Sequence, residues 1–233
     1  MKNNLIILIP AYNEEKTVDL LLNGWSRVLS SLSIDYKIMI FDDGSTDATR
    51  ERVLALKKMD DNIILLPLKH CGYNKTINTI YNYSLDTEWI FQADFDDEIM
   101  PDEFLKLWKL KDDVDAVLGV RLHRQNLLRT VVSSFASFWI KFLFGYGVKD
   151  VNIPFRLLRY DVFKPLLKKI PEGTLYPNLF ISAYINRYKI KMVQIPIVYK
   201  VRSFGASHLS NFGKLFKHCV ISGWQLLKLK FSK

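Results

Sequence analysis

The sequence predicts an α/β fold in which a mainly parallel central sheet is flanked by helices. Short aliphatic runs recur through the first half of the chain, and segments with apolar residues at helical spacing lie between them. Continuous aliphatic strands that alternate with helices are typical of βαβ units and of a parallel sheet buried on both faces. No Gly- or Ser-rich linker divides the 233 residues. We therefore expect one α/β domain with an extension toward its C-terminus.

Strands and helices are expected in alternation from the N-terminus. The aliphatic runs predict strands at Leu5–Ile9, Tyr36–Phe41, Ile63–Leu66, Trp89–Ala93 and Ala116–Val120. The first intervening segment has a regular apolar helical face, the second opens with residues that favour helix N-termini, and the last follows a proline. The helices are accordingly predicted at Thr17–Leu32, Asp47–Met59, Lys75–Leu85 and Asp102–Leu110. In such a fold the binding crevice lies at the carboxyl ends of the strands.

Composition excludes several classes of protein. Apolar residues make up 49% and charged residues 24% of the chain, with only 10 Gly and 8 Pro, which excludes disordered and fibrous proteins. The two cysteines, Cys71 and Cys219, are far apart, so neither a disulfide framework nor a zinc cluster is expected, and a reducing cytoplasm fits. Neither a signal peptide nor a spanning helix is expected, because no uninterrupted apolar run approaches ~18 residues. Lys and Arg number 33 against 24 Asp and Glu, and this +9 excess indicates an anionic partner.

Acidic residues follow three of the expected strands. They occur in Pro10–Glu15, Asp42–Asp47 and Asp94–Asp97, at strand ends that a parallel sheet brings to one edge. Carboxylates gathered in this way repel one another unless they hold a cation or a ligand rich in donors. Asp-x-Asp at a strand end points both carboxylates to the same side, which suits a hard cation that also binds phosphates. Each motif alone also fits an ordinary turn. Their joint occurrence at equivalent strand ends favours a functional site that binds a cation and its ligand.

These motifs resemble the signatures of family 2 glycosyltransferases. The residues concerned are Ile9–Glu15, Phe41–Asp47 and Gln92–Asp97. Within that family the chain is most similar to the dolichol/polyprenyl-phosphate sugar transferase branch. The similarity covers about residues 5–210, and its later part consists of Gly119–Arg121, Asp150–Asn152, Phe155–Arg156 and Arg202–His208.

The resemblance implies a GT-A fold, a UDP- or GDP-sugar donor and a Mg²⁺ or Mn²⁺ ion. The metal would be held by Asp94 and Asp96. The base would bond to Asp43, and the donor phosphates would meet Arg121 and Arg202. Donor-binding roles are implied at Pro10, Tyr12, Glu14, Phe41, Asp43, Asp94, Phe95, Arg202 and His208. Two positions depart from the branch, since His208 stands where it has Lys and Glu98 where Gln is usual.

The resemblance also implies inversion by a single displacement, with Asp96, Arg121 and Asp150 as the catalytic residues. The first choice of acceptor is a polyprenyl phosphate, which is already anionic and needs cations rather than a base. Arg121, Arg124 and Arg129 are the candidate cations, and a solvent-exposed basic helix face is an equal interpretation for Arg124. A hydroxyl of a growing glycan or glycolipid is the alternative acceptor. It would need a base, for which Asp150 is preferred to Asp97 or Glu98.

The expected division of the chain is a GT-A domain at 1–210, with a donor half (1–120) and an acceptor half (121–210). Residues 211–233 follow as a basic amphipathic helix with five lysines and no acid, typical of a membrane surface. Aromatic residues also recur on one helical face of 133–147, as either a core face or an interfacial one. We expect a cytoplasmic protein, peripheral at the inner face of the membrane, with a membrane protein as a further possible partner.

Other classes fit the sequence less well. A haloacid-dehalogenase-like phosphatase would have its Asp-x-Asp near the first strand, with Thr or Val where this chain has Glu98. A nucleotidyltransferase would need a Gly-rich basic loop after the first strand, but Pro10–Glu15 is acidic. The charge of +9 also suggests a non-enzymatic anion-binding protein. Nucleic acid is not an expected partner, because the acids at the sheet edge oppose a phosphate backbone.

Overall fold

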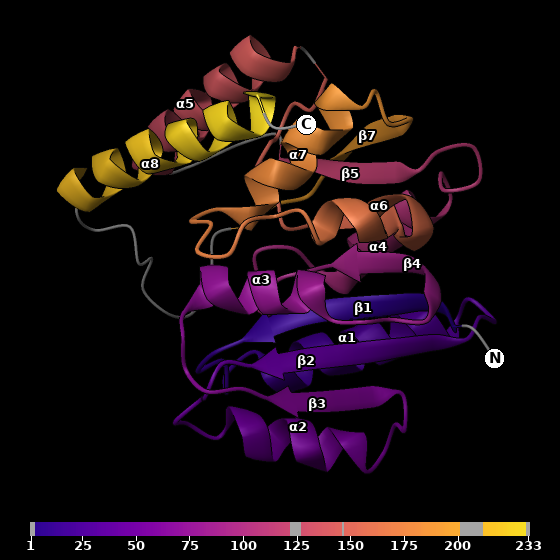
Figure 1. Cartoon of the computed structure of the whole chain (residues 1–233). Coiled ribbons are helices and arrows are strands. Elements are labelled where there is room, and N and C mark those ends of the chain that lie inside the picture. Colours follow the sequence, from indigo (N-terminus) through magenta and orange to yellow (C-terminus); the bar gives the residue numbers. More distant parts are fainter. Residues whose placement is uncertain (1–2, 122–126, 146, 201–211, 232–233) are drawn as a thin grey trace.

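The structure is a computed structural model that describes residues 3–121, 127–145, 147–200 and 212–231. Within these residues, seven strands form one sheet in the order β3-β2-β1-β4-β6-β5-β7 (Figure 1). Their bounds are β1 Asn3–Ala11, β2 Tyr36–Asp42, β3 Ile63–Pro67, β4 Thr87–Gln92, β5 Ala116–Arg121, β6 Arg156–Arg159 and β7 Met192–Ile197. All pairings are parallel except those of β6, which runs antiparallel to both β4 and β5. The predicted mainly parallel α/β sheet is confirmed.

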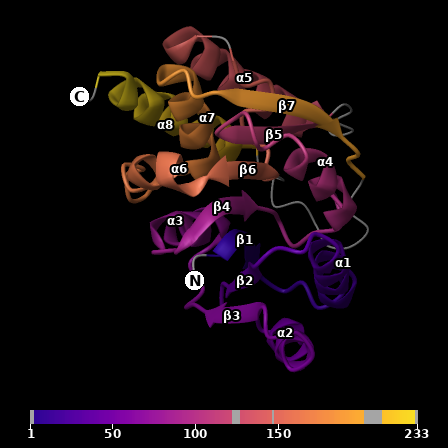
Figure 2. The same cartoon turned by 90° about the vertical axis from the view of Figure 1, so that its right-hand side faces the viewer.

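Helices cover both faces of the sheet, as Figure 2 shows. They are α1 Val18–Ser30, α2 Thr49–Lys57, α3 Tyr73–Asn82, η1 Pro101–Glu103, α4 Phe104–Trp108, α5 Leu127–Phe144, α6 Tyr160–Leu167, α7 Pro177–Arg187 and α8 Phe212–Phe231. Strand β1 shows how the two cores arise. Its Leu5, Ile7 and Ile9 pack in the core that α1, α2 and α4 cover, while Ile6 and Leu8 pack in the core beneath α3 and α5–α8.

All nine expected elements of the first half are present, with ends that differ by a few residues. Four elements of the second half were not predicted, namely β6, α6, α7 and β7. Strand β6 is only four residues long, and both its ends are arginines, so it gives no aliphatic run. Helix α7 is buried over nine of its eleven residues, which removes the amphipathic period that marks a surface helix. Strand β7 is an edge strand with Gln194 and Pro196 in its middle.

Candidate active site

Three acidic loops meet at one edge of the sheet, because β2, β1 and β4 are neighbours and run parallel. The loops after β1 and β2 are also joined by hydrogen bonds. The backbone amide of Asp43 donates to the carbonyl of Ala11 (2.8 Å), and that of Asn13 donates to Ser45 Oγ (3.1 Å). Behind the third loop, Thr17 Oγ1 donates to the carbonyl of Phe95 (3.0 Å). The motif loops therefore form one connected surface.

Two of the motif acids stabilise this surface. The buried Asp42 accepts hydrogen bonds from Arg50 Nε (2.8 Å) and from the backbone amide of Ser45 (2.9 Å). Asp47 accepts one from the backbone amide of Thr49 (3.0 Å), at the start of α2. Burial would raise the pKa of Asp47, but hydrogen bonds from the side chain and backbone of Thr49 outweigh it and hold that pKa below its usual value. Both acids are thus structural.

Asp43, the residue expected to bind the base, is only 2% exposed. Its carboxylate accepts hydrogen bonds from the backbone amides of Cys71 and Gly72, each at 2.8 Å. His70 Nδ1 lies 3.1 Å from the same group. A nucleobase bound to Asp43 would have to share these oxygens with the loop at 70–72. In this structure the carboxylate fixes that loop against the end of β2.

The loop that Asp43 fixes places an aromatic pair at the same edge. The rings of Tyr12 and His70 stack with centroids 4.3 Å apart and an angle of 25° between their planes. Gly44 allows the two loops to approach, since its φ is +72° and a Cβ there would lie 2.9 Å from the amide nitrogen of His70. The pair forms a flat aromatic surface beside the ends of β1 and β2, where a base can stack.

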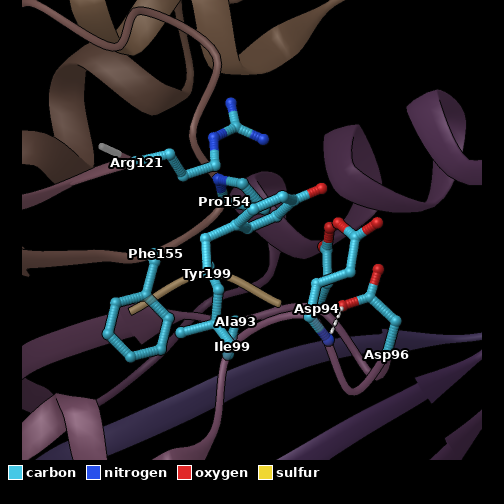
Figure 3. A pocket seen from close by; sticks show the side chains of 9 residues that line it. Ala93, Asp94, Asp96, Ile99, Arg121, Pro154, Phe155 and Tyr199 are labelled. Carbon is cyan, nitrogen blue, oxygen red and sulfur yellow. Dashed lines mark hydrogen bonds between the residues drawn. The ribbon is translucent and has the colours of Figure 1, made fainter. Parts of the chain in front are cut away.

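A small pocket opens beyond β4 and is lined by carboxylates on one side and a guanidinium on the other. In Figure 3, Arg121 lies on one side of the pocket and Asp94 and Asp96 on the other, with the ring of Tyr199 between them in this view. Its lining consists of Ala93, Asp94, Asp96, Glu98, Ile99, Arg121, Pro154, Phe155 and Tyr199. The enclosed space is about 10 Å³, so it suits a cation or a water rather than a whole sugar.

Asp94 has the strongest electrostatic signature in the pocket. Its pKa is raised to about 7, mainly by burial and further by the charges of Glu98 and Glu14. Tyr73 Oη donates a hydrogen bond to Asp94 Oδ1 (2.8 Å), which acts in the opposite direction, as does the charge of Arg121. Burial and the neighbouring acids thus disfavour the ionised form of Asp94, and a bound cation would stabilise it.

The residues present fit a Mg²⁺ or Mn²⁺ ion of the kind that the resemblance implies. Within the described ranges, no three acidic, His or Cys side chains form a ready metal cage. Mg²⁺ commonly takes one or two carboxylates, with water and ligand phosphates supplying the other oxygens. Asp94 and Asp96, on one side of the pocket, match that requirement.

Arg121 is held by Asp150 in a two-point ion pair. Its Nε donates to Asp150 Oδ2 (2.8 Å) and its second terminal nitrogen donates to Oδ1 (2.9 Å). Burial opposes the charge on Arg121, yet the bond and charge of Asp150 outweigh it and raise the pKa of the guanidinium. The guanidinium carbon also lies 5.6 Å from the ring centre of Tyr199. Arg121 is therefore a permanent, oriented cation at the pocket.

The turn that carries Asp150 is supported by a buried arginine. Arg156 is fully buried and donates to the carbonyls of Ile153 (2.5 Å), Val151 (3.1 Å) and Asn178 (2.8 Å). Burial lowers the pKa of its guanidinium. These bonds tie the turn at 150–154 to the start of α7. Arg156 thus positions Asp150, which in turn positions Arg121.

The other predicted site residues are placed less directly. Pro10, Phe41 and Phe95 are buried and pack beneath the loops rather than on their surface. Glu14 and Asp97 lie in the loops after β1 and β4, and Asp97 is 8% exposed. Three other predicted site residues lie outside the described residues, namely Arg124, Arg202 and His208. Arg129 lies on α5, but its side chain is not among those described.

His70, Tyr73 and Tyr199 contribute to the site but were not predicted from sequence. His70 lies in the connection between β3 and α3, and Tyr73 is the first residue of α3; this segment carries no acidic motif. The position of β3 beside β2 in a parallel sheet is the signal that could have found them. Tyr199 follows β7, which was itself not predicted.

The fold resembles solved structures of glucosyl-3-phosphoglycerate synthase from Mycobacterium tuberculosis. A complex with uridine diphosphate aligns over 98% of this chain and 80% of that one, with a TM-score of 0.69 and 15% identity. A complex with Mn²⁺, UDP-glucose and phosphoglyceric acid aligns over the same shares, with a TM-score of 0.68 and 16% identity. At this identity the likeness shows the fold alone, and it confirms the expected GT-A architecture.

Curated relatives point to one branch of enzymes. The chain is 26% identical over 208 residues to undecaprenyl-phosphate 4-deoxy-4-formamido-L-arabinose transferase of Photorhabdus laumondii, and the protein of that name from Yersinia enterocolitica matches to the same extent. The match covers 88% of this chain but spans only 62% of the length of each relative. The family model described as glycosyl transferase family 2 matches residues 6–167. Because this match takes in more than half of the sequence, the chain belongs to glycosyl transferase family 2.

Proposed function

We propose that the chain is an inverting, metal-dependent glycosyltransferase that moves a sugar from a nucleotide-diphosphate sugar to a polyprenyl phosphate or a similar lipid-linked acceptor. The observation that carries the proposal is the pocket in which Asp94 and Asp96 face Arg121. Two carboxylates suited to a cation and a fixed positive charge line this pocket at the carboxyl edge of the sheet, which supports the proposal. That is where the diphosphate of a donor would need both.

The reaction breaks the bond between the anomeric carbon and the donor diphosphate, which leaves with growing negative charge. When bound, a Mg²⁺ or Mn²⁺ ion held by Asp94 and Asp96 supplies positive charge to these phosphates. Arg121 is fixed by Asp150 and donates to phosphate oxygens without having to reorganise. Tyr12 and His70 offer a stacking surface for the base of a UDP or GDP donor.

The state of Asp150 supports a lipid phosphate as the acceptor. Both its oxygens are bonded to Arg121, so the carboxylate orients a cation instead of accepting a proton from substrate. A phosphate acceptor is already anionic and needs no general base. The undecaprenyl-phosphate transferases among the relatives are named for such an acceptor. A glycan or glycolipid hydroxyl is the second candidate, and the base it needs would be Glu98, which lines the pocket.

A lipid acceptor would bring the enzyme to the inner face of the cytoplasmic membrane as a peripheral protein, alone or with a membrane-protein partner. The net charge of +9 favours an anionic surface. In the part of the chain that the structure describes, no helix combines the length and hydropathy needed to cross a bilayer.

The proposal is tested in two steps. Thermal shifts are first measured with UDP- and GDP-sugars, with and without Mn²⁺, to find the donor. Transfer of labelled sugar from that donor to a short-chain polyprenyl phosphate is then followed, with wild type compared with Asp96→Asn and with the exposed control Asp113→Asn. We expect Asp96→Asn alone to abolish the metal-dependent shift and the transfer. A chain that binds no nucleotide sugar, or transfers equally well without metal and in Asp96→Asn, would refute the proposal.

A further inference from the structure

Helices α5 and α8 pack side by side at one end of the molecule (Figure 1). They leave several apolar side chains exposed. On α5, Ile140 and Leu143 are buried in the core, whereas Phe138 and Phe142 are 59% and 70% exposed. The rings of these two phenylalanines stack with centroids 6.0 Å apart. In the described part of the predicted aromatic stripe, Phe138 and Phe142 are thus exposed, whereas Trp139 is half-buried and packs against the core. Tyr146 and the side chain of Phe135 lie outside the described residues.

Helix α8 continues the same apolar surface. Val220, Trp224 and Phe231 are 44%, 62% and 78% exposed, and their spacing of four and seven residues places them on one helical face. The opposite side of the helix is buried through Leu226 and Leu229. Each of the two helices thus has a core face and a second, exposed apolar face. We call the exposed set Phe138, Phe142, Val220, Trp224 and Phe231 the α5–α8 surface.

A groove runs between the two helices on this surface. Its volume is about 190 Å³, and it is lined by Trp139, Val220, Gly223, Trp224 and Leu227. A Cβ at Gly223 would lie 3.4 Å from the ring of Trp139, so the glycine allows the indole to lie close against α8. Contiguous exposed apolar surface of this kind marks sites that bind a membrane, a protein or a ligand.

The charge of the two helices indicates what binds there. Neither α5 nor α8 contains an Asp or Glu, while α5 has two basic residues and α8 has four lysines. Lys228 and Lys230 are exposed near the end of α8 that carries Phe231. Aromatic side chains flanked by lysines without acids suit the headgroup region of an anionic bilayer, where each basic residue near the surface adds ~1 kcal/mol.

We propose that the α5–α8 surface is the face by which this chain docks on an anionic phospholipid bilayer, with Phe142 and Trp224 inserted between the lipids. The inference rests on the proposed function, since it brings the pocket to a phosphate carried by a lipid. The chain order supports it. Helix α5 begins six residues after the pocket residue Arg121, a span of at most ~21 Å, and α8 is the next described element after Tyr199.

The test is co-sedimentation of the purified chain with vesicles of phosphatidylcholine, alone or mixed with phosphatidylglycerol. We expect wild type to bind the mixed vesicles and to dissociate at high salt. The double variant Phe142→Glu/Trp224→Glu should bind at least about tenfold more weakly, because two charges enter the apolar contact. Leu20→Glu and Met59→Glu are the matched controls, since these side chains are 54% and 83% exposed on other parts of the chain. Both controls should bind like wild type.

Several outcomes would overturn the proposal. The proposal fails if wild type does not bind the vesicles, or if the double variant binds them like wild type. It also fails if neutral and anionic vesicles bind equally well, or if the surface instead joins two copies of the chain. The last would appear as a dimer in sedimentation that the double variant disrupts, without vesicle binding. If the double variant unfolds, Phe142→Ser and Trp224→Ser are compared singly. Vesicle binding is measured without a nucleotide sugar, and the thermal shift with nucleotide sugars is measured without lipid. The docking proposal and the proposed function can therefore fail independently of each other.

Discussion

The loops after β1 and β2 and the pocket after β4 both carry motif carboxylates, but the two regions use them differently. In the first region, Asp42 and Asp43 are buried, and their oxygens accept hydrogen bonds from the arginine or backbone amides around them. In the pocket, burial and, to a smaller extent, acidic neighbours raise the pKa of Asp94 to about 7. The difference shows that acids in neighbouring motifs can have separate surroundings: those of the first region are used in loop assembly, and we propose that those of the pocket bind the metal and donor.

The largest effect is expected where the pocket loses a carboxylate. Asp94→Asn should lower kcat/KM by about 100-fold or more, because it removes a charge that we propose holds the metal. The melting temperature of the metal-free protein should stay the same or rise, since the substitution removes a buried negative charge that its surroundings disfavour. Steady-state kinetics and thermal unfolding of the same preparation check both parts. If Asp94→Asn lost stability but kept its activity, Asp94 would have a structural role like that of Asp42, and the proposed difference between the two regions would be wrong.

The opposite result is expected for the first region. Asp42→Ala should lower the free energy of unfolding by about 1–3 kcal/mol, because it leaves the amide of Ser45 and the side chain of Arg50 without their acceptor. Arg52→Ala is the control, since it breaks only an exposed pair with Asp19 and should cost less than about 1 kcal/mol. Urea denaturation measures both. Equal losses in the two variants would contradict a structural role for Asp42.

The pocket should also respond to pH. The pKa of Asp94 is about 7 in the folded chain and 3.8 in the unfolded chain. Between pH 3.8 and pH 7 the folded chain therefore keeps a proton that the unfolded chain has lost. The contribution of Asp94 to stability is therefore present at low pH and lost as pH rises through 7. Metal binding needs the ionised form, so Mn²⁺ should bind about tenfold more tightly at pH 8 than at pH 6. Calorimetric titration at both values, with Asp94→Asn as the reference, tests this.

A smaller effect should separate Tyr73 from the metal ligands themselves. In the wild type, the hydrogen bond from Tyr73 lowers the pKa of the Asp94 carboxyl. Tyr73→Phe removes this bond, so the pKa of Asp94 should rise. The pH midpoint for Mn²⁺ binding should then move upward, and affinity at pH 7 should fall by a few-fold, as the loss of ~1 kcal/mol implies. Tyr83→Phe, on the loop after α3, is the control. An unchanged midpoint would show that Tyr73 does not position Asp94.

Local sequence patterns were enough to predict the first five strands, the helices between them and the sheet edge that carries the acids. Each of these features depends on neighbours in the chain, such as the aliphatic runs at Leu5–Ile9 and Trp89–Ala93. The second half was harder, because α7 is buried on nearly every side and β6 is very short. Their apolar patterns therefore lack the period that marks a helix or strand.

Motifs that are local in the chain were enough to predict that acids gather at the carboxyl edge of a parallel sheet, because βαβ units bring those strand ends together. Which acids are used internally depends on the packing of distant segments, since the hydrogen bond between Asp43 and the amide of Gly72 joins residues 29 apart. The tertiary structure also pairs Asp150 with Arg121 and exposes Phe142 rather than burying it. Burial and partner choice depend on packing between distant segments, and these set the charge and chemistry of each side chain.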